Sequence, residues 1–146
     1  GLLIVKDGQP EEWANFYPWN APPRTAAIAL RDPESTAMAC IKSKSPVVIE
    51  DIAKELGKSN QGNRRYIRCN TQDGDQGSLL CSPVINPTTG QVDYVINICG
   101  DVKRCLVKKH LPLYKWIIKH YSLRIALEHR LIILKEKIYG TAYKQP

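Results

Sequence analysis

No stretch of 18 or more consecutive apolar residues occurs in this 146-residue chain, so no segment is long enough to cross a membrane as a helix. The sequence also lacks GxGxxG and GxxxxGK[ST], the glycine-rich patterns that most often hold nucleotide phosphates. No Ser/His/Asp or paired-carboxylate arrangement can be argued from the order of its residues. No residue pattern therefore indicates catalysis by itself.

The cysteines lack the pattern of a disulfide framework or a zinc site. There are five, an odd number, and no two of them form a CxxC pair. Cys81 and Cys99 fall in predicted strands, where a cysteine packs as a small apolar side chain. We therefore expect a reducing compartment, the cytoplasm.

A metal site is not indicated by the histidines. The three of them, His110, His120 and His129, all lie in or beside the last predicted helix. His120 and His129 are nine residues apart and fall on different sides of that helix. We expect solvated or packing histidines and no bound metal.

The positive charge is confined to one end of the chain. Residues 1–101 contain 10 Lys/Arg and 12 Asp/Glu, whereas residues 102–146 contain 11 Lys/Arg and 2 Asp/Glu. The net charge of +7 therefore belongs to the last segment, which is mostly helix. A length of 146 residues predicts one domain over 1–146, and the apolar first residues read as a strand, so we expect a piece excised from a longer protein.

The pattern of apolar and turn residues predicts an α+β domain. Proline at positions 33 and 46 brackets a helix, and proline at 112 opens a long last helix that ends before Gly140. The strands are expected at 2–6, 13–17, 47–49, 79–85 and 92–98, a helical turn at 52–56, and the last helix at 112–139.

The last helix has two opposed apolar sides at ~100° per residue. A helix that only covers its own sheet needs one such side, so the second predicts a homodimer. The side assigned to the sheet is Trp116, His120, Leu123, Leu127, Leu131, Leu134 and Ile138. The side assigned to the dimer interface is Tyr114, Ile118, Tyr121, Ile125 and Ile132, with a stripe of lysine and arginine between the two.

Two motifs and their order resemble the GAF domain family, a sensory and regulatory module. Residues 46–52 (PVVIEDI) resemble the strand before the family's variable loop, and residues 77–84 (GSLLCSPV) resemble the strand after it. The match covers residues 25–139 best and includes the last helix. The resemblance implies a central antiparallel sheet of about five or six strands, with a helix and a loop covering one face and the terminal helix on the other.

The resemblance also implies a function. Family members bind cyclic nucleotides, bilins, haem or other small molecules, and relay the signal through a terminal helix in a parallel dimer to an attached output domain. Other members have no ligand and serve as dimerisation modules, which is the alternative here. The sequence does not identify a cofactor, although no cysteine is followed by histidine, the usual bilin attachment signal.

The candidate ligand-binding residues are Arg65, Tyr66 and Arg68 in the covering loop and Ser78 on the next strand. Guanidinium groups pair with phosphate and stack on rings, so these residues suit an anionic ligand. A solvated basic loop is the competing interpretation. The polar stretch 57–77 around them is expected to be the most mobile part of the domain, lying over one sheet face.

Cys69 is the weak catalytic candidate. It lies beside Arg68, which favours a thiolate, and residues 66–70 faintly resemble the catalytic-cysteine loop of free methionine sulfoxide reductases, an enzymatic GAF branch. That branch also needs upstream cysteines among glycines and acids on the following strand, whereas Cys40 has no glycine neighbours. A thiol-dependent reductase is thus a second alternative. Nucleic-acid binding by the basic helix is a further one, disfavoured because its apolar sides are needed for packing.

Overall fold

The computed structural model describes residues 1–15, 27–59 and 77–139. Its centre is a five-stranded sheet in which every neighbouring pair of strands is antiparallel, in the order β2-β1-β5-β4-β3. The α+β class predicted from the sequence is confirmed. The strands are β1 (Leu2–Lys6), β2 (Gln9–Asn15), β3 (Val47–Ile49), β4 (Ser78–Ile85) and β5 (Val92–Gly100).

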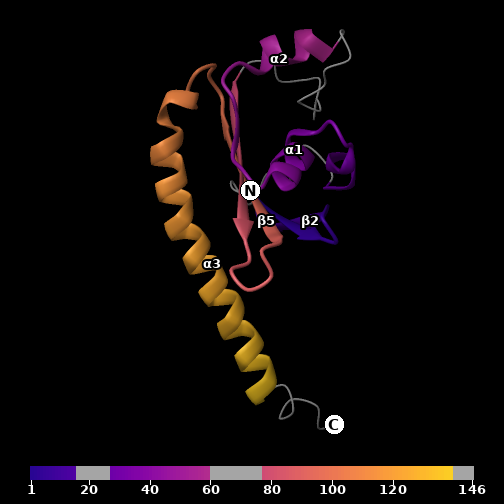
Figure 1. The fold of residues 1–146 in the computed structure, drawn as a ribbon, viewed down its shortest axis with the longest axis vertical. Coiled ribbons are helices and arrows are strands. Elements are labelled where there is room, and N and C mark those ends of the chain that lie inside the picture. The colour runs from indigo at the N-terminus through magenta and orange to yellow at the C-terminus, as the bar shows by residue number, and fades with distance from the viewer. Residues whose placement is uncertain (16–26, 60–76, 140–146) are drawn as a thin grey trace.

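Helices lie on both faces of this sheet (Figure 1). The helix α1 covers one face, and the long helix α3 runs along the other. The helices are η1 (Ala27–Arg31, 3-10), α1 (Thr36–Ser43), α2 (Ile52–Ser59), η2 (Lys108–His110, 3-10) and α3 (Leu111–Tyr139).

The longest strand pair, β4 and β5, is closed by the turn that the sequence predicts. The Asn86 side-chain oxygen accepts a hydrogen bond from the Thr88 amide at 2.8 Å, and the Asn86 amide donates to the Gln91 carbonyl at 2.8 Å. Gly90 has a φ of 67°, a left-handed conformation that glycine adopts without a steric penalty. The turn sets the register in which Ser82 lies opposite Ile96.

The first hairpin is tighter than predicted. Asp7 and Gly8 have positive φ values of 51° and 72°, and Lys6 pairs directly with Gln9 across them. Because two such residues suffice for a hairpin turn, β2 begins at Gln9 rather than at Trp13. Pro10 is tolerated there because β2 is an edge strand with one unpaired side.

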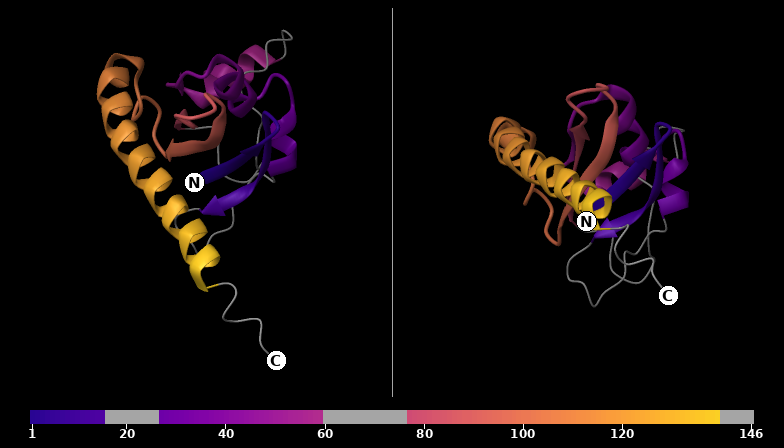
Figure 2. Two further views of the ribbon diagram at one scale, coloured as in Figure 1. Left: turned by 60° about the horizontal axis from the view of Figure 1, so that its bottom comes forward. Right: turned by 90° about the horizontal axis from the view of Figure 1, so that it is seen from below.

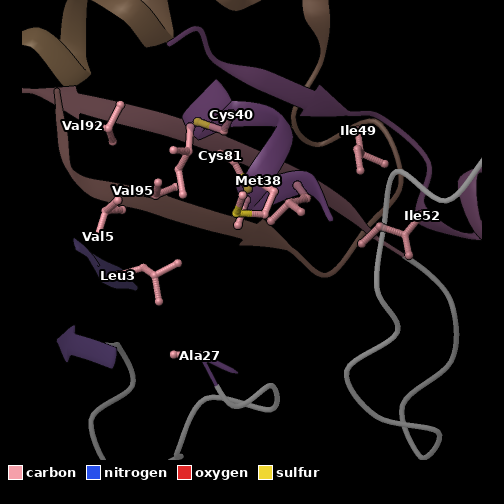
Figure 3. Packing of buried hydrophobic residues seen from close by; sticks show 13 residues of the cluster. Leu3, Val5, Ala27, Met38, Cys40, Ile49, Ile52, Cys81, Val92 and Val95 are labelled. Carbon is pink, nitrogen blue, oxygen red and sulfur yellow. The ribbon is translucent and has the colours of Figure 1, made fainter. Parts of the chain in front are cut away.

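The main core lies between α1 and the sheet (Figure 3). Met38 and Cys40 of α1 point toward Cys81 and Val95 of the central strands. Leu3, Cys40 and Val95 are fully buried, as expected where alternate strand residues face a covering helix. The cap of α1 is Ser35, whose hydroxyl accepts from the Met38 amide at 3.0 Å.

A second, smaller core lies between α3 and the sheet. Ile118 of α3 packs with Val48 of β3 and Leu80 of β4, and all three are buried. Two views show that α3 continues well past the sheet toward its C-terminal end (Figures 1 and 2). Only the first half of α3 is therefore covered by this domain.

Candidate functional site

The inner side of α3 is the side that the sequence assigned to a dimer. Ile118 has 5% of its surface exposed, and the Tyr114 side chain is half-buried with its hydroxyl accepting from the Val107 amide at 3.1 Å. Ile125 is also partly covered. These residues pack against their own chain, so the sequence-based interface requires correction at Tyr114 and Ile118.

Two other members of that predicted interface, Tyr121 and Ile132, are 65% and 54% exposed. Ile132 belongs to the same side of the helix as Ile118 but lies on the half of α3 that extends past the sheet. Its exposure therefore follows from the length of the helix.

The side opposite Ile118 carries the residues that the sequence assigned to the sheet, and they are exposed. We call five of them the outer stripe: Leu123, Leu127, Leu131, Leu134 and Ile138, each between 44% and 63% exposed. His120 and Trp116 continue the same line toward the start of α3, and Trp116 is 61% exposed. This line of exposed apolar side chains runs along most of the length of α3.

The spacing of the outer stripe suits a second helix. Leu123 and Leu134 are eleven residues apart, as are Leu127 and Ile138. An eleven-residue repeat corresponds to 3.67 residues per turn, close to the 3.6 of a straight α-helix. Two such helices would stay in contact over this length with little supercoiling.

The length of the last helix is a signal that the sequence does contain. Five strands span roughly 24 Å across a sheet, at about 4.8 Å per strand. A helix of 29 residues is about 43 Å long at about 1.5 Å per residue. Part of the helix is therefore expected to extend past its own sheet.

The segment that joins β5 to α3 is held to the sheet by two polar side chains. The Ser78 hydroxyl, fully buried, donates to the Val102 carbonyl at 3.2 Å and accepts from the Leu106 amide at 3.0 Å. The Glu50 carboxylate accepts from the Lys108 amide at 2.8 Å, and its backbone carbonyl accepts from the Arg104 amide at 2.6 Å. Sequence reasoning did not assign Glu50 this role.

This placement bears on the predicted ligand site. Ser78 lies on the α3 side of the sheet, whereas its neighbour Leu79 packs in the α1 core. Its hydroxyl already bonds the β5–α3 connection, so a ligand contact for Ser78 stays a prediction. Arg65, Tyr66 and Arg68 lie outside the described residues, as do Cys69 and most of the stretch predicted to be mobile.

A small cavity of about 170 Å³ opens beside this connection. It is lined by Val48, Ile49, Glu50, Asp51, Lys54, Glu55, Arg104 and Lys108. Three carboxylates and three cations offset one another there, and the Glu50 carboxylate is engaged by the Lys108 amide. The lining therefore selects no single class of ligand.

The four described cysteines differ in burial. Burial raises the pKa of the Cys40 thiol to about 12, so it is protonated at neutral pH and unreactive. The Cys81 thiol, also buried, donates to the Asn97 side-chain oxygen at 2.6 Å. Cys99 and Cys105 are exposed, and no disulfide joins any of these four.

Within residues 1–15, 27–59 and 77–139, no three His, Cys, Asp or Glu side chains are grouped so that they could share a metal ion. None of the helices in those ranges has the length and apolarity needed to cross a membrane. The chain matches no family model, no curated protein and no solved structure.

Proposed function

We propose that the chain is a regulatory module that forms a homodimer through the outer stripe of α3. The observation that carries the proposal is the exposure of Leu123, Leu127, Leu131, Leu134 and Ile138 along one line of the helix. Each such side chain contributes on the order of 1.5–3 kcal/mol when it leaves water, before the cost of association. A contiguous exposed apolar surface of this kind typically marks an interaction site.

The charges beside the outer stripe favour a parallel pair. One flank of the helix carries Arg130 and Lys137, whereas the other carries Lys135 and Arg124, with Arg124 paired to Glu128 at 2.6 Å. In an antiparallel pair the same flank of each helix comes together, so the basic flank of one helix would lie against the basic flank of its partner. In a parallel pair unlike flanks meet, and Glu128 of one helix comes opposite the basic flank of its partner.

The same helix is suited to carry a signal. Its start is tied to β4 by Ser78 and to β3 by Glu50, so a displacement of either strand end would shift the connection to α3. A parallel dimer would bring both far ends of α3 together, where an attached output domain would respond. This is the behaviour implied by the GAF resemblance, with a small molecule held near Arg65, Tyr66 and Arg68 as the expected input.

A pair of matched variants tests the dimer. Leu127→Lys with Leu134→Lys places two charges in the outer stripe, and the variant should sediment as a folded monomer. Ile132→Lys is the control, because Ile132 is as exposed as Leu127, at 54%, but lies on the inner side of α3. The control should remain dimeric. A monomeric Ile132→Lys variant, with Leu127→Lys/Leu134→Lys still dimeric, would restore the interface expected from the sequence and reject this one.

A further inference from the structure

The segment from the β5–α3 connection to the first third of α3 is the most basic part of the chain. Residues 102–120 contain six Lys/Arg and no Asp/Glu. Two of the six, Arg104 and Lys108, line the cavity that also holds Glu50, Asp51 and Glu55, so carboxylates offset their charge. The others, Lys103, Lys109, Lys115 and Lys119, are exposed and line no such cavity.

Two large apolar side chains are exposed among these lysines. Leu113 is 53% and Trp116 is 61% exposed, and the Trp116 ring packs against the His120 ring with centroids 4.4 Å apart. At ~100° per residue, Leu113 and Trp116 fall on the side of α3 that faces away from the sheet, and Lys119 falls on the flank beside them. Lys109 lies just before α3, in η2. We call this set the basic end: Lys109, Leu113, Lys115, Trp116 and Lys119.

We propose that the basic end docks onto an anionic lipid surface. Lysines supply the attraction to negative headgroups, and an exposed Trp and Leu between them insert at the level of the headgroups. The same combination distinguishes a lipid surface from a nucleic acid. Phosphate backbones are bound by basic and polar side chains, and they provide no apolar phase for Leu113.

The body of the domain leaves this contact accessible. Ile118 faces Val48 and Leu80, so the sheet lies on the opposite side of α3 from Trp116. One basic end is complete in a single chain, so the proposal does not need the dimer. It does require that the dimer contact be confined to residues 123–138, because Trp116 continues the line of the outer stripe toward the start of α3. A parallel dimer would place two basic ends at the same end of the paired helices, and two linked contacts bind a surface more tightly than one.

Vesicle co-sedimentation tests this site. The chain should bind vesicles of phosphatidylcholine with 30% phosphatidylserine at low salt and leave vesicles of phosphatidylcholine alone in the supernatant. Each lysine near an anionic surface contributes roughly five-fold to partitioning. Lys109→Gln with Lys119→Gln should therefore weaken binding by more than ten-fold. Trp116→Ser should weaken it further, whereas the matched control Lys135→Gln with Lys137→Gln should bind within a factor of about two of the unmutated chain, since those lysines lie outside the basic end.

Three results would overturn the proposal. The first is no binding to the anionic vesicles at low salt, and the second is an equal loss of binding in the Lys135→Gln/Lys137→Gln control. The third is tighter, strongly salt-dependent binding to duplex DNA. The dimer is assessed separately, because Leu127→Lys with Leu134→Lys leaves the basic end intact. That variant should still bind anionic vesicles, more weakly than the dimer.

Discussion

At the scale of single residues, Ser78 and Glu50 hold the connection between β5 and α3 in place. Each uses polar atoms to bond the backbone between β5 and α3, a connection that contains Arg104 at a φ of 60°. A non-glycine residue in that conformation persists only where the surroundings hold it. The position of α3 therefore depends on two side chains.

The hydroxyl of Ser78 should contribute measurably to the free energy of unfolding. Ser78→Ala would leave the Val102 carbonyl and the Leu106 amide without that partner, at a cost of about 1–3 kcal/mol in the free energy of unfolding. Ser43→Ala is the control, because the shortest bond of the Ser43 hydroxyl is a long 3.4 Å contact near the end of α1. Urea unfolding measures both. Equal, small effects would show that Ser78 does not hold the connection.

Cys40 predicts a dependence of stability on alkaline pH. Burial raises the pKa of its thiol from 9.0 to about 12, so between these pH values the unfolded state loses this proton and the folded state keeps it. A raised folded-state pKa means that its contribution is complete below pH 9 and is lost as pH rises toward 12. The loss reaches about 4 kcal/mol at about 1.36 kcal/mol per pKa unit.

The measurement is a comparison of the unmutated chain with Cys40→Ala by urea unfolding at several alkaline pH values. Their difference in unfolding free energy isolates the Cys40 thiol from the tyrosines and lysines that also titrate there. The unmutated chain should lose stability faster as pH rises. Parallel curves for the two proteins would contradict the burial of this thiol.

At the scale of elements, local patterns predicted most of the fold. The prolines at 33, 46 and 112 and the turn at residues 86–90 placed α1, β3, α3 and the β4–β5 hairpin close to their observed bounds. The 3-10 helix at Ala27–Arg31 was not predicted, because a five-residue segment has too few residues to show a period. Similarly, the start of β2 depended on a two-residue turn between Lys6 and Gln9.

The orientation of α3 could not be obtained from periodicity. Both sides of the helix are apolar at helical spacing, and the period alone does not say which one faces the sheet. Long-range partners decide, here Val48 and Leu80 from strands about 30 residues apart in the sequence. The contacts of Ser78 could not be predicted for the same reason. The residue was placed on the correct strand, but the groups that it bonds belong to the β5–α3 connection.

Two lysine substitutions, one on each side of α3, compare how the two sides are packed. Ile118→Lys would put a charge among Val48 and Leu80, and should destabilise the domain by at least about 3 kcal/mol. Leu127→Lys changes an exposed position and should alter the unfolding free energy of the monomer by less than about 0.5 kcal/mol. Thermal unfolding of both variants, at a protein concentration low enough for the chain to be monomeric, measures this. A stable Ile118→Lys protein would contradict the packing of α3.

At the scale of the whole molecule, helices cover both faces of the sheet, but the cores on the two faces differ in size. The α1 side contains the larger core, whereas the α3 side has a small core and a helix that extends beyond it (Figure 2). A 29-residue helix with half of its length outside its own domain is stable in water mainly when something packs against it. The outer stripe supplies the surface for that partner, and a second copy of the chain is the partner proposed.

Sedimentation velocity of the unmutated chain shows whether a second copy covers the outer stripe. We expect a reversible dimer with twice the 16.5 kDa mass of one chain at micromolar concentration, weakened only slightly by 0.5 M salt because its seam is apolar and only the flanking charges are screened. A single species of 16.5 kDa at several hundred micromolar would contradict it.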